Sequence, residues 1–141
     1  MVPVIRWTVL VVEDNPGDAD LIRECADDFT GISIHHVPNA MQATRYLAQK
    51  SPFDECPKPD LVLLDLGLTG FDGVFVLQTM RESPAFDQTP VVVYTSSRRP
   101  ADEQKCRALG ATEYLVKPSE WGAWHRTLRL LFRRHLKGFG E

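Results

Sequence analysis

The sequence predicts an α/β protein with a doubly wound, five-stranded parallel sheet built from successive βα units, a (βα)5 architecture. Five short apolar runs alternate along the chain with segments whose apolar residues recur at helical spacing. The runs are continuous rather than alternating, which is typical of strands buried on both faces. Strands that alternate with helices favour parallel pairing through right-handed crossovers, with helices on both sides of the sheet.

The predicted strands are the five apolar runs. VVVYT is the run richest in β-branched residues and the clearest strand, whereas ISIHHV is a weaker one. A glycine-rich turn containing Gly70, Asp72 and Gly73 follows the third strand. The five runs are residues 8–12, 32–37, 61–64, 91–95 and 113–116.

The predicted helices lie between and after these strands. Asn39 and Ser119 are placed to cap the second and fifth helices at their N-termini. Gly110 follows the fourth helix, as a glycine that ends a helix commonly does. Three prolines within 51–59 predict a loop there. The expected helices span about 18–29, 39–50, 73–81, 101–109 and 119–137.

The last of these helices has an apolar face and a basic end. Trp121, Trp124, Leu128 and Leu131 recur at a spacing of three and four, which predicts contact with the sheet. Cations near a helix C-terminus interact favourably with the helix dipole, and we prefer this explanation of the basic end to nucleic-acid binding. The basic residues are Arg126, Arg129, Arg133, Arg134 and Lys137.

Length and composition predict a single domain and exclude several classes of protein. The chain has 141 residues, 43% hydrophobic and 25% charged, with a net charge of −3. We expect one domain over 1–141, with its core at about 8–137. The charge balance does not indicate a nucleic-acid or membrane partner. No apolar run is long enough to span a membrane and no secretory signal is present, so the expected location is cytoplasmic.

The cysteines argue against a disulfide framework or a structural zinc site. Cys25, Cys56 and Cys106 are odd in number and widely separated, and none forms a C-x-x-C pair. This usage is typical of a protein in a reducing compartment.

Polar residues collect where the predicted strands end. Glu13 and Asp14 follow the first strand, and Asp65 follows the third. Thr95 ends the fourth strand, and Lys117 follows the fifth. In an open α/β sheet the functional crevice lies at the carboxyl ends of the strands, so these side chains are expected to meet. Three carboxylates at one edge repel one another, and an all-oxygen ligand set favours Mg²⁺ as the counter-ion.

This set of residues suits phosphoryl transfer. Lys117 offers a positive charge to one phosphoryl oxygen, and Thr95 can donate a hydrogen bond to another. A carboxylate such as Asp65 can act as the nucleophile and form an aspartyl phosphate. In such reactions catalysis consists largely of positioning and charge neutralisation.

Four blocks, VVEDN, LVLLDLGLTGFDG, PVVVYTSS and GATEYLVKP, resemble the signature blocks of the response-regulator receiver domain of two-component signalling. They occur in the family's order and at its separation, from about residue 8 to 135. The resemblance implies a flavodoxin-like, CheY-like fold. The stretch EDNPGDADLIRE and the proline-rich loop also resemble the small receivers that partner cyanobacterial-type phytochrome kinases.

The resemblance implies a role for each site residue. Asp65 would be the phosphoacceptor, paired with Lys117, which would then bind the phosphoryl group. Asp14 would bind Mg²⁺ directly and Glu13 through water, and the carbonyl of Gly67 would complete the protein ligands.

The resemblance also implies a switch. Thr95 would follow the phosphoryl group, and Tyr114 would be the aromatic residue that turns inward with it. Three positions depart from the common pattern: Glu13 replaces an aspartate, Thr69 replaces a proline, and Gly67 has no side chain to orient attacking water. These departures bear on the lifetime of the phosphate rather than on its formation.

The expected function is that of a stand-alone response regulator, a signalling protein that catalyses only its own phosphorylation and dephosphorylation. The implied partners are a sensor histidine kinase or phosphotransfer protein and a downstream protein target, and a homodimer through the last helices stays open. A pseudo-receiver adaptor is one alternative, although such modules typically lack an acid or the lysine. A haloacid-dehalogenase-type phosphatase is another, but it needs a second acid where Gly67 stands.

Overall fold

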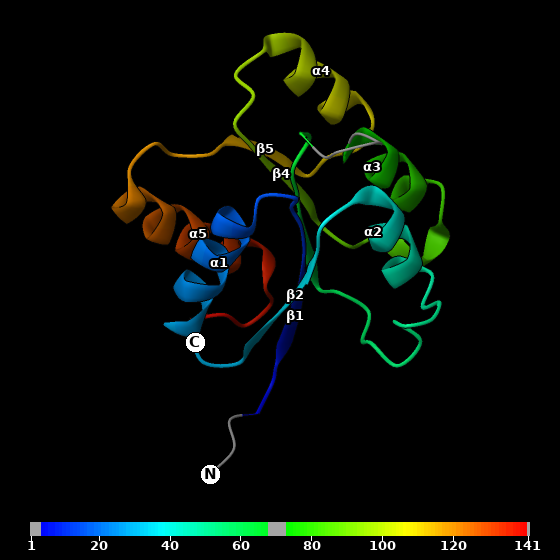
Figure 1. Cartoon of the computed structure of the whole chain (residues 1–141), viewed down its shortest axis with the longest axis horizontal. Helices are drawn as coiled ribbons and strands as arrows, with labels where there is room; N and C mark the ends of the chain where they lie inside the picture. Colours follow the sequence, from blue (N-terminus) through cyan, green and yellow to red (C-terminus); the bar gives the residue numbers. More distant parts are fainter. Residues whose placement is uncertain (1–3, 68–72, 141) are drawn as a thin grey trace.

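A computed structural model describes residues 4–67 and 73–140 and has a central sheet covered by helices on both faces (Figure 1). The predicted fold class is therefore confirmed; Thr69, Gly70 and Asp72 lie outside the described residues. The strands are β1 (Trp7–Val12), β2 (Ile32–Val37), β3 (Leu61–Leu64), β4 (Val91–Thr95) and β5 (Glu113–Val116). The helices are α1 (Pro16–Asp27), α2 (Ala40–Leu47), α3 (Gly73–Arg81), α4 (Pro100–Ala108) and α5 (Trp121–His135), with a 3₁₀ turn η1 (Pro84–Phe86).

The strand order is β2-β1-β3-β4-β5, and all pairs are parallel. From β1 the chain first moves outward to β2 and then crosses to β3 on the other side, so the topological switch point lies between β1 and β3. In sheets of this kind the functional crevice opens at the carboxyl ends next to such a point. The residues that follow β1 and β3 are therefore placed at the centre of this crevice.

The backbones of three residues at this edge continue the sheet ladder. The amide of Glu13 donates to the carbonyl of Val37 at 3.0 Å, and that of Asp65 donates to Val12 at 3.1 Å. The amide of Lys117 donates to the carbonyl of Thr95 at 2.7 Å. The sheet thus fixes where these side chains start.

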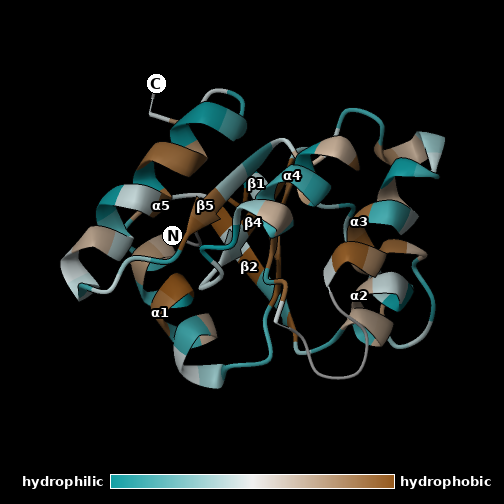
Figure 2. Ribbon diagram, turned by 90° about the horizontal axis from the view of Figure 1, so that it is seen from above, coloured by the Kyte–Doolittle hydropathy of each residue, from teal (hydrophilic) through white to brown (hydrophobic). Residues whose placement is uncertain are grey.

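Side chains alternate between two core layers along each central strand. In β1, Val9 and Val11 pack toward α1 and α5, whereas Leu10 and Val12 pack toward α2 and α3. Figure 2 shows the hydrophobic sides of the helices turned toward the sheet. β2 is an edge strand, and most of its residues are half-buried, which explains its weaker apolar pattern.

Two of the three predicted helix ends are confirmed. Asn39 caps α2 and accepts a hydrogen bond from the amide of Gln42 at 2.8 Å. Gly110 adopts a φ of +101° just beyond the end of α4, a conformation that favours glycine. The prediction for Ser119 is wrong, because α5 begins after Glu120, whose side chain makes no capping bond.

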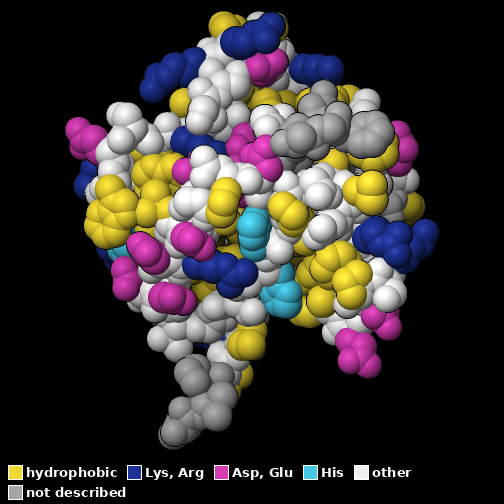
Figure 3. Space-filling view, in the orientation of Figure 1, with side chains coloured by type: hydrophobic (Ala, Val, Ile, Leu, Met, Phe, Trp, Pro, Cys, Tyr) yellow, Lys and Arg dark blue, Asp and Glu magenta, His cyan; other side chains and the backbone are white. Residues whose placement is uncertain are grey.

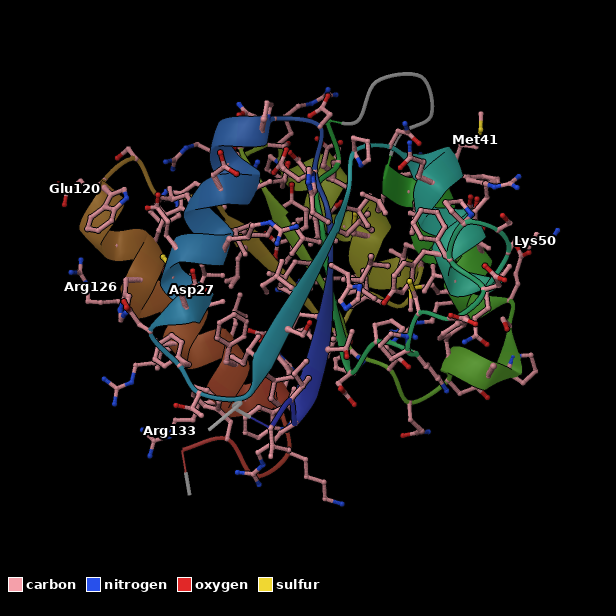
Figure 4. The ribbon with its side chains drawn as sticks, turned by 60° about the horizontal axis from the view of Figure 1, so that its bottom comes forward. Asp27, Met41, Lys50, Glu120, Arg126 and Arg133 are labelled. Carbon is pink, nitrogen blue, oxygen red and sulfur yellow. The ribbon has the colours of Figure 1, made fainter. Side chains whose placement is uncertain are left out.

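Most of the predicted apolar face of α5 is confirmed. Trp124, Leu128 and Leu131 are buried against the sheet. Trp121, the first residue of the helix, is 65% exposed and is not part of the buried core. Figure 4 shows Arg126 and Arg133 pointing away from the sheet. Among the described residues, no helix has the length and apolarity needed to cross a membrane.

The two ends of the described chain are joined beside β1. The indole nitrogen of Trp7 donates to the carbonyl of Lys137 at 2.9 Å. The ring of Trp7 also meets that of Phe139 edge-on, with centroids 5.7 Å apart. Because Trp7 begins β1, this junction lies at the amino ends of the strands, opposite the crevice.

Helix α3 begins in direct contact with the backbone of Asp65. A Cβ added to Gly73 would lie 2.3 Å from the carbonyl oxygen of Asp65 and 3.1 Å from its carbonyl carbon. Real atoms do not approach this closely, so the start of α3 depends on a glycine here. The packing of α3 and the position of Asp65 are consequently coupled.

We therefore expect Gly73→Ala to lower the free energy of unfolding by about 1–3 kcal/mol, because the new methyl group must push the Asp65 backbone away. Gly122→Ala is the control, since its Cβ would meet only the Arg126 guanidinium at 3.7 Å within 4 Å. That helical substitution should be neutral or stabilising by up to about 1 kcal/mol. Urea unfolding measures both, and equal effects of the two substitutions would contradict the coupling.

Candidate functional site

A cavity of about 380 Å³ opens at the carboxyl ends of the strands. It contains all the residues that the sequence predicts for the site apart from Tyr114, together with several that it does not. The sheet therefore brings these residues together as parallel strands at a switch point require. The lining residues are Glu13, Asp14, Asn15, Asp18, Asp65, Leu66, Gly67, Thr95, Ser96, Ser97, Asp102 and Lys117.

The ammonium group of Lys117 is the centre of the site. It lies 2.6 Å from Glu13 Oε1, 2.8 Å from Asp65 Oδ2 and 2.8 Å from Asp18 Oδ2. Lys117 is only 8% exposed, and burial by itself would lower the pKa of its amine. The hydrogen bonds to the three carboxylates outweigh burial and raise that pKa, so Lys117 is held as a cation.

Glu13 and Asp65 are buried next to each other and behave as a pair. Burial, followed by the hydrogen bond to Asp65, raises the pKa of Glu13 from 4.5 to about 7. Burial would also raise the pKa of Asp65, but the hydrogen bonds with Glu13, Lys117 and the Gly67 amide lower it. Near neutral pH, Asp65 is thus the charged member, with its carboxylate available for chemistry.

The acids also fit a divalent cation. Glu13, Asp14 and Asp65 each offer a carboxylate oxygen, and these oxygens lie within 4.8 Å of one another. Glu13 and Asp65 are buried, whereas Asp14 is half-buried at the mouth of the cavity. Hard oxygen donors without histidine or cysteine suit a cation of the Mg²⁺ or Mn²⁺ type.

Gly67 follows Asp65 by two residues, Thr95 ends β4, and both line the cavity. The amide of Gly67 donates to Asp65 Oδ1 at 3.1 Å, so the two oxygens of Asp65 have different partners. Thr95 is buried, and its hydroxyl oxygen accepts a hydrogen bond from the amide of Ser97 at 3.3 Å. The hydroxyl proton of Thr95 therefore remains available as a donor.

Tyr114 lies behind the cavity and reaches the loop after β4. Its side chain is 6% exposed, and its hydroxyl donates to the carbonyl of Ser97 at 3.1 Å. The sequence-based expectation was a tyrosine that turns inward when the site is phosphorylated. In the structure the ring is buried, and its hydroxyl ties the loop that bears Ser97 to β5.

The sequence analysis missed six residues that line the cavity, namely Asn15, Asp18, Leu66, Ser96, Ser97 and Asp102. Ser97 connects Thr95 to Tyr114, and its hydroxyl donates to the carboxylate of Asp102. Asp18 contacts Lys117 from the first turn of α1. The signal that could have indicated Asp18 is its place as an acid in the first turn of the helix that follows Glu13 and Asp14.

The chain is similar to known proteins in sequence and in fold. Residues 9–129 match the family model described as the response regulator receiver domain. Response regulator Rcp1 of Synechocystis sp. is 33% identical over 113 residues, which cover 77% of this chain and 75% of that protein.

Two solved structures are similar over nearly the whole chain. The phosphorylated cyanobacterial phytochrome response regulator RcpA has a TM-score of 0.88 and 28% identity, covering 94% of this chain and 95% of its own. The Mn²⁺-bound form of Rcp1 has a TM-score of 0.86 and 27% identity, covering 94% and 96%.

The raised pKa of Glu13 predicts how stability depends on pH when divalent cations are chelated. The folded pKa of about 7 exceeds the unfolded value of 4.5, so folding favours the protonated form. This contribution is complete below pH 4.5 and is lost as pH rises through 7. We expect the free energy of unfolding of Glu13→Gln, which cannot ionise, to increase relative to wild type by roughly 3 kcal/mol as the pH rises from 5 to 8.

Denaturant unfolding in chelator at several pH values measures this difference. Glu24→Gln, which removes an exposed carboxylate from α1, is the control. A difference between Glu13→Gln and wild type that stays constant with pH would show that Glu13 does not hold the proton.

Proposed function

This chain belongs to the response regulator receiver domain family, and we propose that it accepts a phosphoryl group on Asp65 with the help of Mg²⁺. The proposal makes the protein a stand-alone signalling receiver that changes its contacts with a protein partner. The observation that carries it is the placement of the Asp65 carboxylate, with Lys117 at 2.8 Å and two further acids within ligand distance.

The two oxygens of Asp65 have different hydrogen-bond partners. Oδ1 accepts the amide hydrogen bond of Gly67, and Oδ2 faces Lys117. In the proposed transfer, one oxygen attacks the phosphorus of a phosphohistidine and the P–N bond breaks. Its electron pair stays on the imidazole nitrogen, which regains a proton, and an aspartyl phosphate remains. Lys117 and the hydroxyl of Thr95 then bind phosphoryl oxygens.

Glu13, Asp14 and Asp65 are the residues that would hold the cation, with Gly67 contributing its carbonyl. The bound cation supplies positive charge that offsets the negative charge of the phosphoryl group. Asp14 is proposed as a direct ligand and Glu13 as a ligand through water. Catalysis is limited to the protein's own phosphorylation and dephosphorylation.

The geometry does not favour a haloacid-dehalogenase-type phosphatase. Such an enzyme needs a second acid two residues after the nucleophile, and Gly67 stands there with only its amide on Asp65. The pseudo-receiver alternative predicts that the wild-type protein takes up no phosphate.

Receiver domains take their phosphoryl group from histidine kinases or phosphotransfer proteins, and we propose a phytochrome-type histidine kinase as the donor here. The support is the similarity to RcpA, which is a phytochrome response regulator, over 94% of this chain. A cytoplasmic location and a single receiver domain over 1–141 are part of the same proposal.

We propose that the output surface is formed by α4, β5 and α5. Thr95 and Tyr114 are both hydrogen-bonded to Ser97. A hydrogen bond from Thr95 to a phosphoryl oxygen would therefore shift Ser97, and with it the start of α4 and Tyr114 on β5. The downstream protein, or a second copy of the chain through the last helices, would bind this surface.

The first test is phosphorylation by a small donor. Wild type with acetyl phosphate and Mg²⁺ should gain the mass of one phosphoryl group, because the carboxylate of Asp65 is charged and exposed to the cavity. Asp65→Asn should gain none, and chelation should stop the reaction in wild type. Intact-mass spectrometry decides the matter, and equal uptake by both proteins would exclude Asp65 as the acceptor.

The second test concerns the output surface. Beryllofluoride with Mg²⁺, a phosphoryl mimic, should slow amide hydrogen exchange after β4 and within 113–137, because Ser97 links these segments. In Tyr114→Phe, which loses the hydroxyl bond to Ser97, the change in exchange should stay near Asp65. Wild-type changes confined to residues around Asp65 would contradict the proposed route.

A further inference from the structure

Asp18 holds Lys117 from outside the set of residues assigned so far. Its Oδ2 lies 2.8 Å from the lysine nitrogen, and its side chain is 27% exposed. The contact joins α1 to the end of β5, across 99 positions of the sequence. It is also one of the hydrogen bonds that keep Lys117 positively charged.

The start of α1 explains why Asp18 is available for this contact. Asn15 caps the helix and accepts a hydrogen bond from the amide of Asp18 at 3.2 Å. An acid at this third helical position commonly returns a bond to the amide of the capping residue. Here Glu13 Oε2 accepts the hydrogen bond from the amide of Asn15 at 3.2 Å. The carboxylate of Asp18 is therefore directed toward Lys117 instead.

The other acids of α1 have a different environment. Asp20, Glu24 and Asp27 are exposed, and acidic side chains gather over α1 in Figure 3. Lys117 forms ion pairs with Glu13, Asp18 and Asp65 and with none of these three acids. Asp18, in contrast, lines the cavity. The charge of Asp18 therefore acts inside the site rather than on the solvated face of the helix.

Lys117 donates to three carboxylates, but two of them have a second use in the proposed function. Glu13 and Asp65 belong to the trio of acids that fit a divalent cation, and Asp65 is also the proposed phosphoacceptor. Asp18 is not a member of that trio. When the other two acids turn to new partners, Asp18 is the carboxylate that keeps its bond to the ammonium group.

We propose that Asp18 is a positioning residue, which keeps the ammonium group of Lys117 directed into the site while Glu13 and Asp65 engage the cation and the phosphoryl group. This inference rests on the proposed function for the identity of those new partners. A lysine side chain has four flexible carbons, so a second fixed contact is needed to hold its charge at one place. Asp18 acts through Lys117 and has no contact of its own with the phosphoryl group.

The kinetic test compares three variants at saturating Mg²⁺. Asp18→Ala should slow phosphorylation of Asp65 by acetyl phosphate about tenfold, the usual effect of one hydrogen bond between charged groups. Asp18→Asn keeps an oxygen that accepts from Lys117 and should recover most of the rate. Asp20→Asn removes the same charge from the exposed face of α1 and should match wild type.

A second readout does not depend on phosphorylation. Proton–nitrogen NMR of the Lys117 ammonium group reports how firmly its protons are held. Without divalent cations, Glu13 and Asp65 should preserve this signal in both wild type and Asp18→Ala. With Mg²⁺, wild type should keep the signal and Asp18→Ala should lose it, a dependence on the cation that loss of a helix-stabilising acid would not produce.

The outcomes separate this inference from the proposed function. Failure of wild type to take up phosphate would overturn the proposed function, while the NMR comparison would still decide the role of Asp18. An Asp18→Ala variant as fast as wild type, or faster, would overturn the positioning role and indicate that Asp18 restrains Lys117. The same signal with and without Mg²⁺ in Asp18→Ala would overturn it as well.

Discussion

The site depends on the buried ammonium group of Lys117, which pairs with three carboxylates. Carboxylates this close repel one another, and burial removes the water that would otherwise screen them. Lys117 offsets part of this charge, and a proton on Glu13 offsets more. An arrangement so rich in negative charge favours added positive charge, which is the physical reason for proposing a cation site here. The rest of the fold serves to hold these groups in place.

The sheet provides that rigidity through its ladder. Glu13, Asp65 and Lys117 each begin where a strand's hydrogen bonds end, so their backbones cannot move independently of the core. Gly73 adds a further constraint, because α3 starts against the carbonyl of Asp65. The Asp65 carboxylate is thus fixed by neighbours on two sides while its oxygens face the cavity.

The sequence was sufficient for the strand ends and for the residues that follow them, because apolar runs and parallel topology determine both. The sequence was insufficient at the start of α5, where the N-cap position is Glu120 and not Ser119. Trp121 follows the apolar spacing of its helix but is 65% exposed. The inward position of Tyr114 and the contact of Asp18 with Lys117 depend on side-chain directions across different elements, which spacing along one element does not specify.

The junction of Trp7 with Lys137 holds both ends of the described chain at the edge of the sheet opposite the cavity. Both ends of the described chain leave the domain at the amino edge of the sheet, while the acids and the lysine open at the carboxyl edge. The carboxyl edge therefore stays clear of both ends of the described chain. The two edges of one sheet thus divide the surface, with the ends of the described chain at one edge and an open cavity at the other.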